Sequence, residues 1–165
     1  MRLSARLRSL LTALGFLGFL VSASGARAGG PDGKVFGIGV CVPEPSAFTF
    51  EIYLSHATAV DFAVGWDTFS DKNGYGHFDY LVYPLDLARS GTVAVPFYLG
   101  LGVWLREVHS DVDFGVRVPF GLAINFRNAP LQIFGELAVK ILIASAYDPA
   151  DRVDLDGDVG FRLYF

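Results

Sequence analysis

The chain has 165 residues, of which 52% are hydrophobic and 15% aromatic, and its mean hydropathy is +0.42. That length accommodates one domain, without room for a second catalytic module. The hydropathy is high for a water-soluble domain, yet the longest nearly uninterrupted apolar run, Leu10–Val21, has only 12 residues. A membrane-spanning helix needs about 20. The single cysteine, Cys41, excludes an internal disulfide and a four-cysteine metal site.

The first 28 residues have the pattern of a secretory signal peptide. Three arginines precede the apolar run, and Ala26-Arg27-Ala28 after it supplies an A-x-A cleavage sequence. The alternative is a membrane anchor that is kept, which the shortness of the run disfavours. We therefore expect a cleaved signal peptide at 1–28 and an exported mature domain at 29–165.

Removal of the signal peptide changes the charge of the protein. It would leave nine basic and 17 acidic residues, for a net charge of −8. Binding to nucleic acid depends on the neutralisation of phosphates by basic side chains. The charge of the mature chain therefore argues against a nucleic-acid partner.

From residue 34 onwards, apolar residues alternate with polar or small ones. This period of two is typical of β-strands whose two faces differ. The clearest example is 112–126, where every second residue from Val112 to Phe126 is apolar and the residues between include Asp113, Arg117 and Asn125. The expected strands are 34–43, 46–55, 58–68, 76–88, 93–107, 112–126, 131–144 and 153–165.

Segments rich in proline and glycine separate most of these strands, as turns do. Eight consecutive strands joined by short turns predict an all-β fold, an eight-stranded antiparallel up-and-down β-barrel. Three prolines, Pro84, Pro96 and Pro119, fall inside expected strands. A closed barrel has no edge strand that could hold a proline, so we expect bulges at these sites, above all at Pro119.

The direction of the apolar face separates soluble barrels from membrane barrels, which carry it outside. Here the polar face holds most of the glycines and alanines, which suits the narrow interior of eight strands. The aromatic residues of the apolar face gather towards strand ends, like the two girdles of bilayer-spanning barrels. The sequence therefore predicts a transmembrane barrel. We expect a periplasmic rim with Phe36, Phe97, Phe126 and Phe165 and an outer rim with Phe48, Trp66, Phe78, Tyr80 and Phe114.

Three stretches resemble a known family: AVDFAVGW at 59–66, GVRVPFGLAINFRNAPLQIFGEL at 115–137 and GDVGFRLYF at 157–165. With the alternation of the whole mature chain, they resemble the small outer-membrane β-barrels of Gram-negative bacteria, the OmpA/OmpX-like transmembrane barrels, and a subgroup of them without an established activity. The resemblance implies an outer-membrane location, with membrane lipid and the barrel-insertion machinery as partners. The family's assembly signal, a terminal Phe with alternating apolar residues before it, corresponds to Phe161, Leu163 and Phe165.

The polar faces of the expected strands carry charged residues that would point into the lumen. Antiparallel pairing of the last two strands about the 146–152 loop places Glu136 beside Arg162 and Lys140 beside Asp158. Eight strands enclose little more than their own side chains. We therefore expect a lumen that is plugged by paired charges and forms no wide pore. The expected lumenal charge network consists of Glu51, Arg117, Glu136, Lys140, Asp158 and Arg162.

The remaining polar motifs do not indicate a catalytic or metal site. The acidic stretch 154–158 lacks the glutamate of a calcium-binding EF-hand loop. The sequence places no orienting carboxylate around His109-Ser110. His56 and His77 are isolated and expected to face solvent at strand ends, and Cys41 is expected to be an inert buried thiol. We therefore expect no enzyme activity, no cofactor and no bound metal.

The sequence favours a structural or membrane-integrity role over two alternatives. The first alternative is a secreted, lipocalin-like barrel that binds a small apolar ligand and would carry residues such as Glu51, Arg117 and Lys140 on its outside. The second is an outer-membrane enzyme that modifies lipids with a histidine and a serine. The short connections between the expected strands argue against an adhesin, which displays long outer loops.

Overall fold

The structure, a computed structural model, describes residues 29–66, 74–108, 111–145 and 152–165. The expected signal peptide at 1–28 and the His109-Ser110 pair lie outside these residues. Within the described residues, no helix is long and apolar enough to cross a membrane. The elements are a 3-10 turn η1 (Pro31–Gly33) and the strands β1 (Phe36–Glu44), β2 (Ser46–Tyr53), β3 (Thr58–Trp66), β4 (Gly74–Arg89), β5 (Val93–Val108), β6 (Asp111–Phe126), β7 (Leu131–Ala144) and β8 (Val153–Tyr164).

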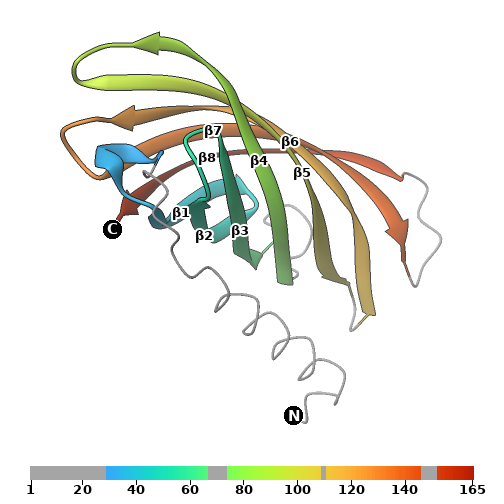
Figure 1. The fold of residues 1–165 in the computed structure, drawn as a ribbon. Coiled ribbons are helices and arrows are strands. Elements are labelled where there is room, and N and C mark those ends of the chain that lie inside the picture. The colour runs from blue at the N-terminus through green and yellow to red at the C-terminus, as the bar shows by residue number, and fades with distance from the viewer. Residues whose placement is uncertain (1–28, 67–73, 109–110, 146–151) are drawn as a thin grey trace.

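The eight strands form one closed antiparallel barrel in which each strand pairs with its neighbours in the chain (Figure 1). Closure occurs between β1 and β8, where Gly37 lies opposite Tyr164. The amide of Phe165 donates a hydrogen bond of 2.8 Å to the carbonyl of Phe36, so the last residue of the chain is tied to the first strand. The predicted all-β, eight-stranded up-and-down barrel is confirmed.

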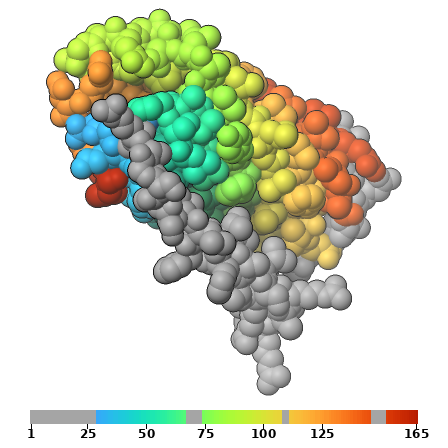
Figure 2. All heavy atoms as spheres, in the orientation of Figure 1, coloured from blue at the N-terminus to red at the C-terminus, as the bar shows by residue number. Residues whose placement is uncertain are grey.

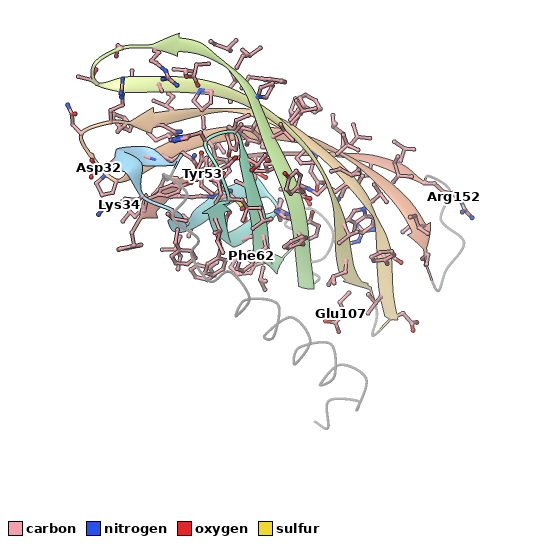
Figure 3. The ribbon with its side chains drawn as sticks, viewed as in Figure 1. Asp32, Lys34, Tyr53, Phe62, Glu107 and Arg152 are labelled. Carbon is pink, nitrogen blue, oxygen red and sulfur yellow. The ribbon has the colours of Figure 1, made fainter. Side chains whose placement is uncertain are left out.

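The two ends of the barrel differ in what they carry. Phe36 and Phe165 lie at one end, which we call the terminal rim, together with the β2–β3, β4–β5 and β6–β7 connections. We call the other end the opposite rim. Figure 3 labels Asp32 and Lys34 near the terminal rim and Glu107 and Arg152 near the opposite rim. The β4–β5 hairpin, yellow-green in Figure 2, extends beyond β3, whose pairing with β4 ends at Val82.

Two of the three expected proline bulges are present. The register of β4 against β5 shifts between residues 82 and 85, beside Pro84, and between 86 and 88, across from Pro96. The prediction of a bulge at Pro119 is wrong, because Pro119 pairs with Ala138 of β7 without a register shift. Proline has no N–H to donate to a neighbouring strand. Pro119 faces this gap on the β5 side of β6, where the β5–β6 pairing is interrupted but keeps its register.

Most large apolar side chains lie on the outside of the barrel, and charged side chains fill its inside. Val64, Leu101 and Leu155 are each about 60% exposed, whereas Glu51 and Arg117 are completely buried. This arrangement is the reverse of that in a soluble barrel, whose core is apolar. The alternation of the sequence therefore predicted the direction of both faces.

The outward aromatic residues follow the two expected rims only in part. Phe36 and Phe165 lie at the terminal rim and Trp66 at the end of β3, as expected. Between the rims, however, the rings of Phe50 and Phe62 stack on each other with their centroids 4.6 Å apart. The aromatic residues thus also occupy the middle of β2 and β3.

Large side chains inside the barrel stand opposite glycines of a neighbouring strand. Tyr98 lies opposite Gly121, where an added Cβ would be 2.5 Å from the tyrosine Oη. Tyr164 lies opposite Gly37, where a Cβ would be 2.6 Å from the ring. These glycines leave the space that the rings occupy in a narrow interior. The same relation joins Trp104 with Gly115, Phe134 with Gly160 and Asp79 with Gly102.

The change Gly121→Ala should lower the free energy of unfolding by about 1–3 kcal/mol, because the new methyl group would clash with Tyr98 and with the backbone carbonyl of Gly135. The matched control is Gly135→Ala, where the nearest atom to an added Cβ is 3.7 Å away. Urea unfolding of the folded barrel in detergent measures both. Equal midpoints for the two variants would contradict the packing relation.

Candidate functional site in the barrel lumen

All six residues of the expected charge network lie inside the barrel and are buried. The structure also adds residues that were not in that network. Among the described residues, the buried acidic side chains are Glu51, Asp61, Asp79, Asp113, Glu136, Asp156 and Asp158, and the buried Lys and Arg side chains are Arg117, Lys140 and Arg162.

The two ion pairs expected between β7 and β8 are wrong. In the structure Glu136 lies opposite Asp158, and Lys140 lies opposite Asp154 instead of Asp158, a shift of four residues. An even shift keeps each side chain on its face, since the strand period is two. The same residues therefore point inward but meet other partners. Register depends on barrel closure and on the path of the connection, which the charges of one hairpin do not specify.

Three carboxylates form a row across neighbouring strands. Glu51 of β2 lies opposite Asp61 of β3, and Asp61 lies opposite Asp79 of β4. All three are at most 1% exposed. Like charges directly opposite each other destabilise a sheet, and burial removes the water that would screen them. The row therefore requires positive partners from elsewhere in the barrel.

Arg117 supplies one positive charge to this row. From β6 its guanidinium binds Asp79 through Nη1 and donates from Nη2 to Glu136 Oε1 at 2.5 Å. Gly102 of β5, the strand between β4 and β6, lies opposite Asp79 on one side and opposite Arg117 on the other. A Cβ on Gly102 would lie 1.9 Å from Asp79 Oδ1. The glycine thus opens the path by which the arginine reaches across β5.

Arg162 supplies the second positive charge, from the other side of the barrel. Its guanidinium donates to Glu51 Oε2 at 2.9 Å and to both carboxylate oxygens of Asp61 at 3.0 Å. It also donates to Thr49 Oγ1 at 2.7 Å. Gly39 of β1 stands between Arg162 and Thr49 in the pairing. Both arginines therefore cross a strand at a glycine to reach the carboxylates.

Tyrosines complete the shell around Glu51. The hydroxyl groups of Tyr83 and Tyr164 both donate to its carboxylate. Tyr53, labelled in Figure 3, lies close to both rings, with centroids 5.3 and 6.0 Å away. Donation from two hydroxyl groups and one guanidinium stabilises the charged form of a carboxylate that water cannot reach.

Lys140 belongs to a separate cluster nearer the opposite rim. Its Nζ lies 2.6 Å from Asp156 Oδ1 and 3.2 Å from Asp154 Oδ2. The same ammonium group lies 5.2 Å from the Trp104 ring and 5.6 Å from the Tyr75 ring, within cation–π distance. The aspartates of the stretch 154–158 thus share the inner face of β8, and two of them bind Lys140.

Cavities lie at both rims of the charged layer. One of about 400 Å³ at the terminal rim is lined by Tyr53, His56, Tyr83 and Asn125 among others. Another of about 220 Å³ at the opposite rim includes Lys140 in its lining. Neither of these two cavities is lined by Arg117, by Arg162 or by the four carboxylates that the two arginines bind. The ion pairs thus occupy the barrel between them.

The placement of His77 at a solvent-facing strand end is wrong. Its side chain is buried, and Nε2 lies 3.7 Å from Asp61 Oδ2 and 3.8 Å from Asp79 Oδ2. The sequence contained the signal, because His77 and Asp79 are two residues apart on one strand and must share a face. His56, in contrast, is exposed, and Cys41 is a buried free thiol.

Comparison with known proteins adds no assignment. No protein-family model, no curated protein and no solved structure matches the chain. What the lumen can do must therefore be argued from its own residues.

Arg117 and Glu136 should show strong energetic coupling. The variants Arg117→Met and Glu136→Gln should each lose about 3–5 kcal/mol of stability, because each leaves a buried charge without its partner. The double variant should lose less than the sum. The comparison pair is Arg162→Met with Glu136→Gln, which share no ion pair in the structure. Urea unfolding should give a smaller coupling for the comparison pair, and equal couplings would contradict the assignment of partners.

Proposed function

We propose that the protein is an outer-membrane β-barrel of a Gram-negative bacterium, exported by a cleaved signal peptide at 1–28, with a structural or membrane-integrity role and a plugged lumen. The observation that carries this proposal is the distribution of the two faces. Apolar side chains cover the outside of a closed sheet whose inside holds the charges. Within hydrocarbon every backbone polar group needs a partner in the protein, and a closed sheet supplies it.

The outer surface also supports contact with lipid. An apolar groove of about 600 Å³ runs over β6, β7 and β8, where Gly135 and Gly157 leave space between Leu122, Leu137 and Val159. A groove of this kind in an apolar belt suits the acyl chains of membrane lipid. Water would be in contact with exposed leucine, valine and phenylalanine side chains over the entire outer face if the barrel were soluble.

The last strand supports assembly by the barrel-insertion machinery. Phe161, Leu163 and Phe165 all project outward and are between 46% and 68% exposed. Their row continues to Phe165, whose amide donates a hydrogen bond to the carbonyl of Phe36 in β1. We propose that these three side chains form the signal by which the machinery recognises the strand that closes the barrel.

The interior supports a plugged barrel over a pore. The bonds of Arg117 join β6 to β4 and β7, and those of Arg162 join β8 to β2 and β3. Several of these bonds connect strands that are not neighbours and therefore cross the lumen. Passage of a solute would require buried ion pairs to separate, which is costly in a low dielectric.

The protein should be found in the outer-membrane fraction and should migrate differently before and after boiling on a denaturing gel, since a closed barrel resists detergent until heated. The purified barrel in planar bilayers should give no large, stable single-channel currents. Release of the protein by osmotic shock would support the secreted binding module instead. Stable currents from a correctly folded sample would contradict the plugged lumen.

Arginine at Leu137 should destabilise the barrel in lipid vesicles by about 2–4 kcal/mol, because Leu137 lies on the outer face midway along β7, where a bilayer is apolar. The matched control is Val153→Arg at the first residue of β8, where the cost should be about 0–1 kcal/mol. Urea unfolding in vesicles measures both changes. Equal costs at the two sites would argue against a bilayer around the belt.

A further inference from the structure

Three buried side chains on β3 and β4 converge in the lumen. Asp61 and Asp79 lie opposite each other, and His77 precedes Asp79 by two residues on the same face. His77 Nε2 is 3.7 Å from Asp61 Oδ2 and 3.8 Å from Asp79 Oδ2. One oxygen or nitrogen from each of the three residues lies within 4.8 Å of the others.

The ring nitrogen that points at this cluster has no hydrogen-bond partner among the described residues, and neither has Asp79 Oδ1. The side chain of His77 is only 3% exposed. At 3.7–3.8 Å the carboxylates are too far for direct hydrogen bonds. The same spacing suits ligands of one ion, since bonds of about 2.0–2.2 Å at tetrahedral or wider angles put ligand atoms roughly 3.4–3.8 Å apart.

The negative charge of the buried carboxylates around the cluster is also only partly neutralised. Arg117 and Arg162 together bind four buried carboxylates, Glu51, Asp61, Asp79 and Glu136. Two positive charges thus face four negative ones, which leaves a deficit of two where the carboxylates are ionised. A divalent cation between Asp61 and Asp79 would balance this set.

We propose that Asp61, His77 and Asp79 bind a divalent transition-metal ion of the Zn²⁺ type inside the barrel. One imidazole nitrogen and two carboxylate oxygens form a mixed donor set that suits such ions better than the all-oxygen sets of Ca²⁺ or Mg²⁺. The two arginines act as outer partners that hold the ligating carboxylates in place. This site is independent of the membrane location proposed above.

The test uses the barrel folded in detergent without a histidine tag and freed of metal by a chelator. Titration with Zn²⁺, followed by calorimetry, should show one site per chain, and Zn²⁺ should raise the unfolding midpoint because it binds only the folded state. Co²⁺ should give the visible absorption of a low-coordinate ion with a nitrogen ligand. Ca²⁺ and Mg²⁺ should not compete at equal concentration.

Two histidine variants locate the site. His77→Ala should weaken Zn²⁺ binding by about 100-fold or more, since even the outer partners of metal ligands are worth about 10- to 100-fold. His56→Ala removes an exposed histidine from the terminal rim and should bind as the unchanged protein does. A cooperative urea transition shows that each variant is folded.

Two results would overturn the proposal. The first is a folded, unchanged protein that binds no Zn²⁺ or Co²⁺ at millimolar concentration. This result needs no variant and is decisive even where His77→Ala does not fold. The second is unchanged binding in folded His77→Ala, which would place the metal elsewhere.

Discussion

The interior of this barrel depends on the neutralisation of a row of carboxylates that the closed sheet removes from water. Glu51, Asp61 and Asp79 lie opposite one another on three successive strands, and Arg117 and Arg162 reach them from two sides. Each arginine bridges two carboxylates, so removal of either would leave more than one buried charge without a partner. The arrangement of strands around the lumen must keep these five side chains together.

The glycines of the polar face follow from the same constraint. Each arginine reaches past the neighbouring strand at a glycine, Gly102 of β5 for Arg117 and Gly39 of β1 for Arg162. Glycines elsewhere make room for Tyr98 and Tyr164. In a barrel of eight strands the interior has a fixed small volume, so each large side chain needs a small one beside it.

The two faces place different demands on the sequence. On the outside, Leu101 and Leu155 need only be apolar for the surface to suit hydrocarbon, and many residues satisfy that condition. On the inside, Arg117 must meet a carboxylate at a defined position, and the cluster of Asp61, His77 and Asp79 brings two aspartates and a histidine to one place. The lumenal face is therefore the more specific of the two.

The alternation of residues by itself determined the number of strands and the bounds of β7. It also determined that Lys140 and Arg162 point inward, because side chains on a strand alternate between faces whatever the strand pairs with. It also implied that His77 shares the face of Asp79. Only the tertiary structure decided which inward residues meet, pairing Glu136 with Arg117 and placing Asp61 beside His77. Register and contacts across the lumen depend on how the connections run and how the sheet closes, and a period of two is unchanged by every even shift of register.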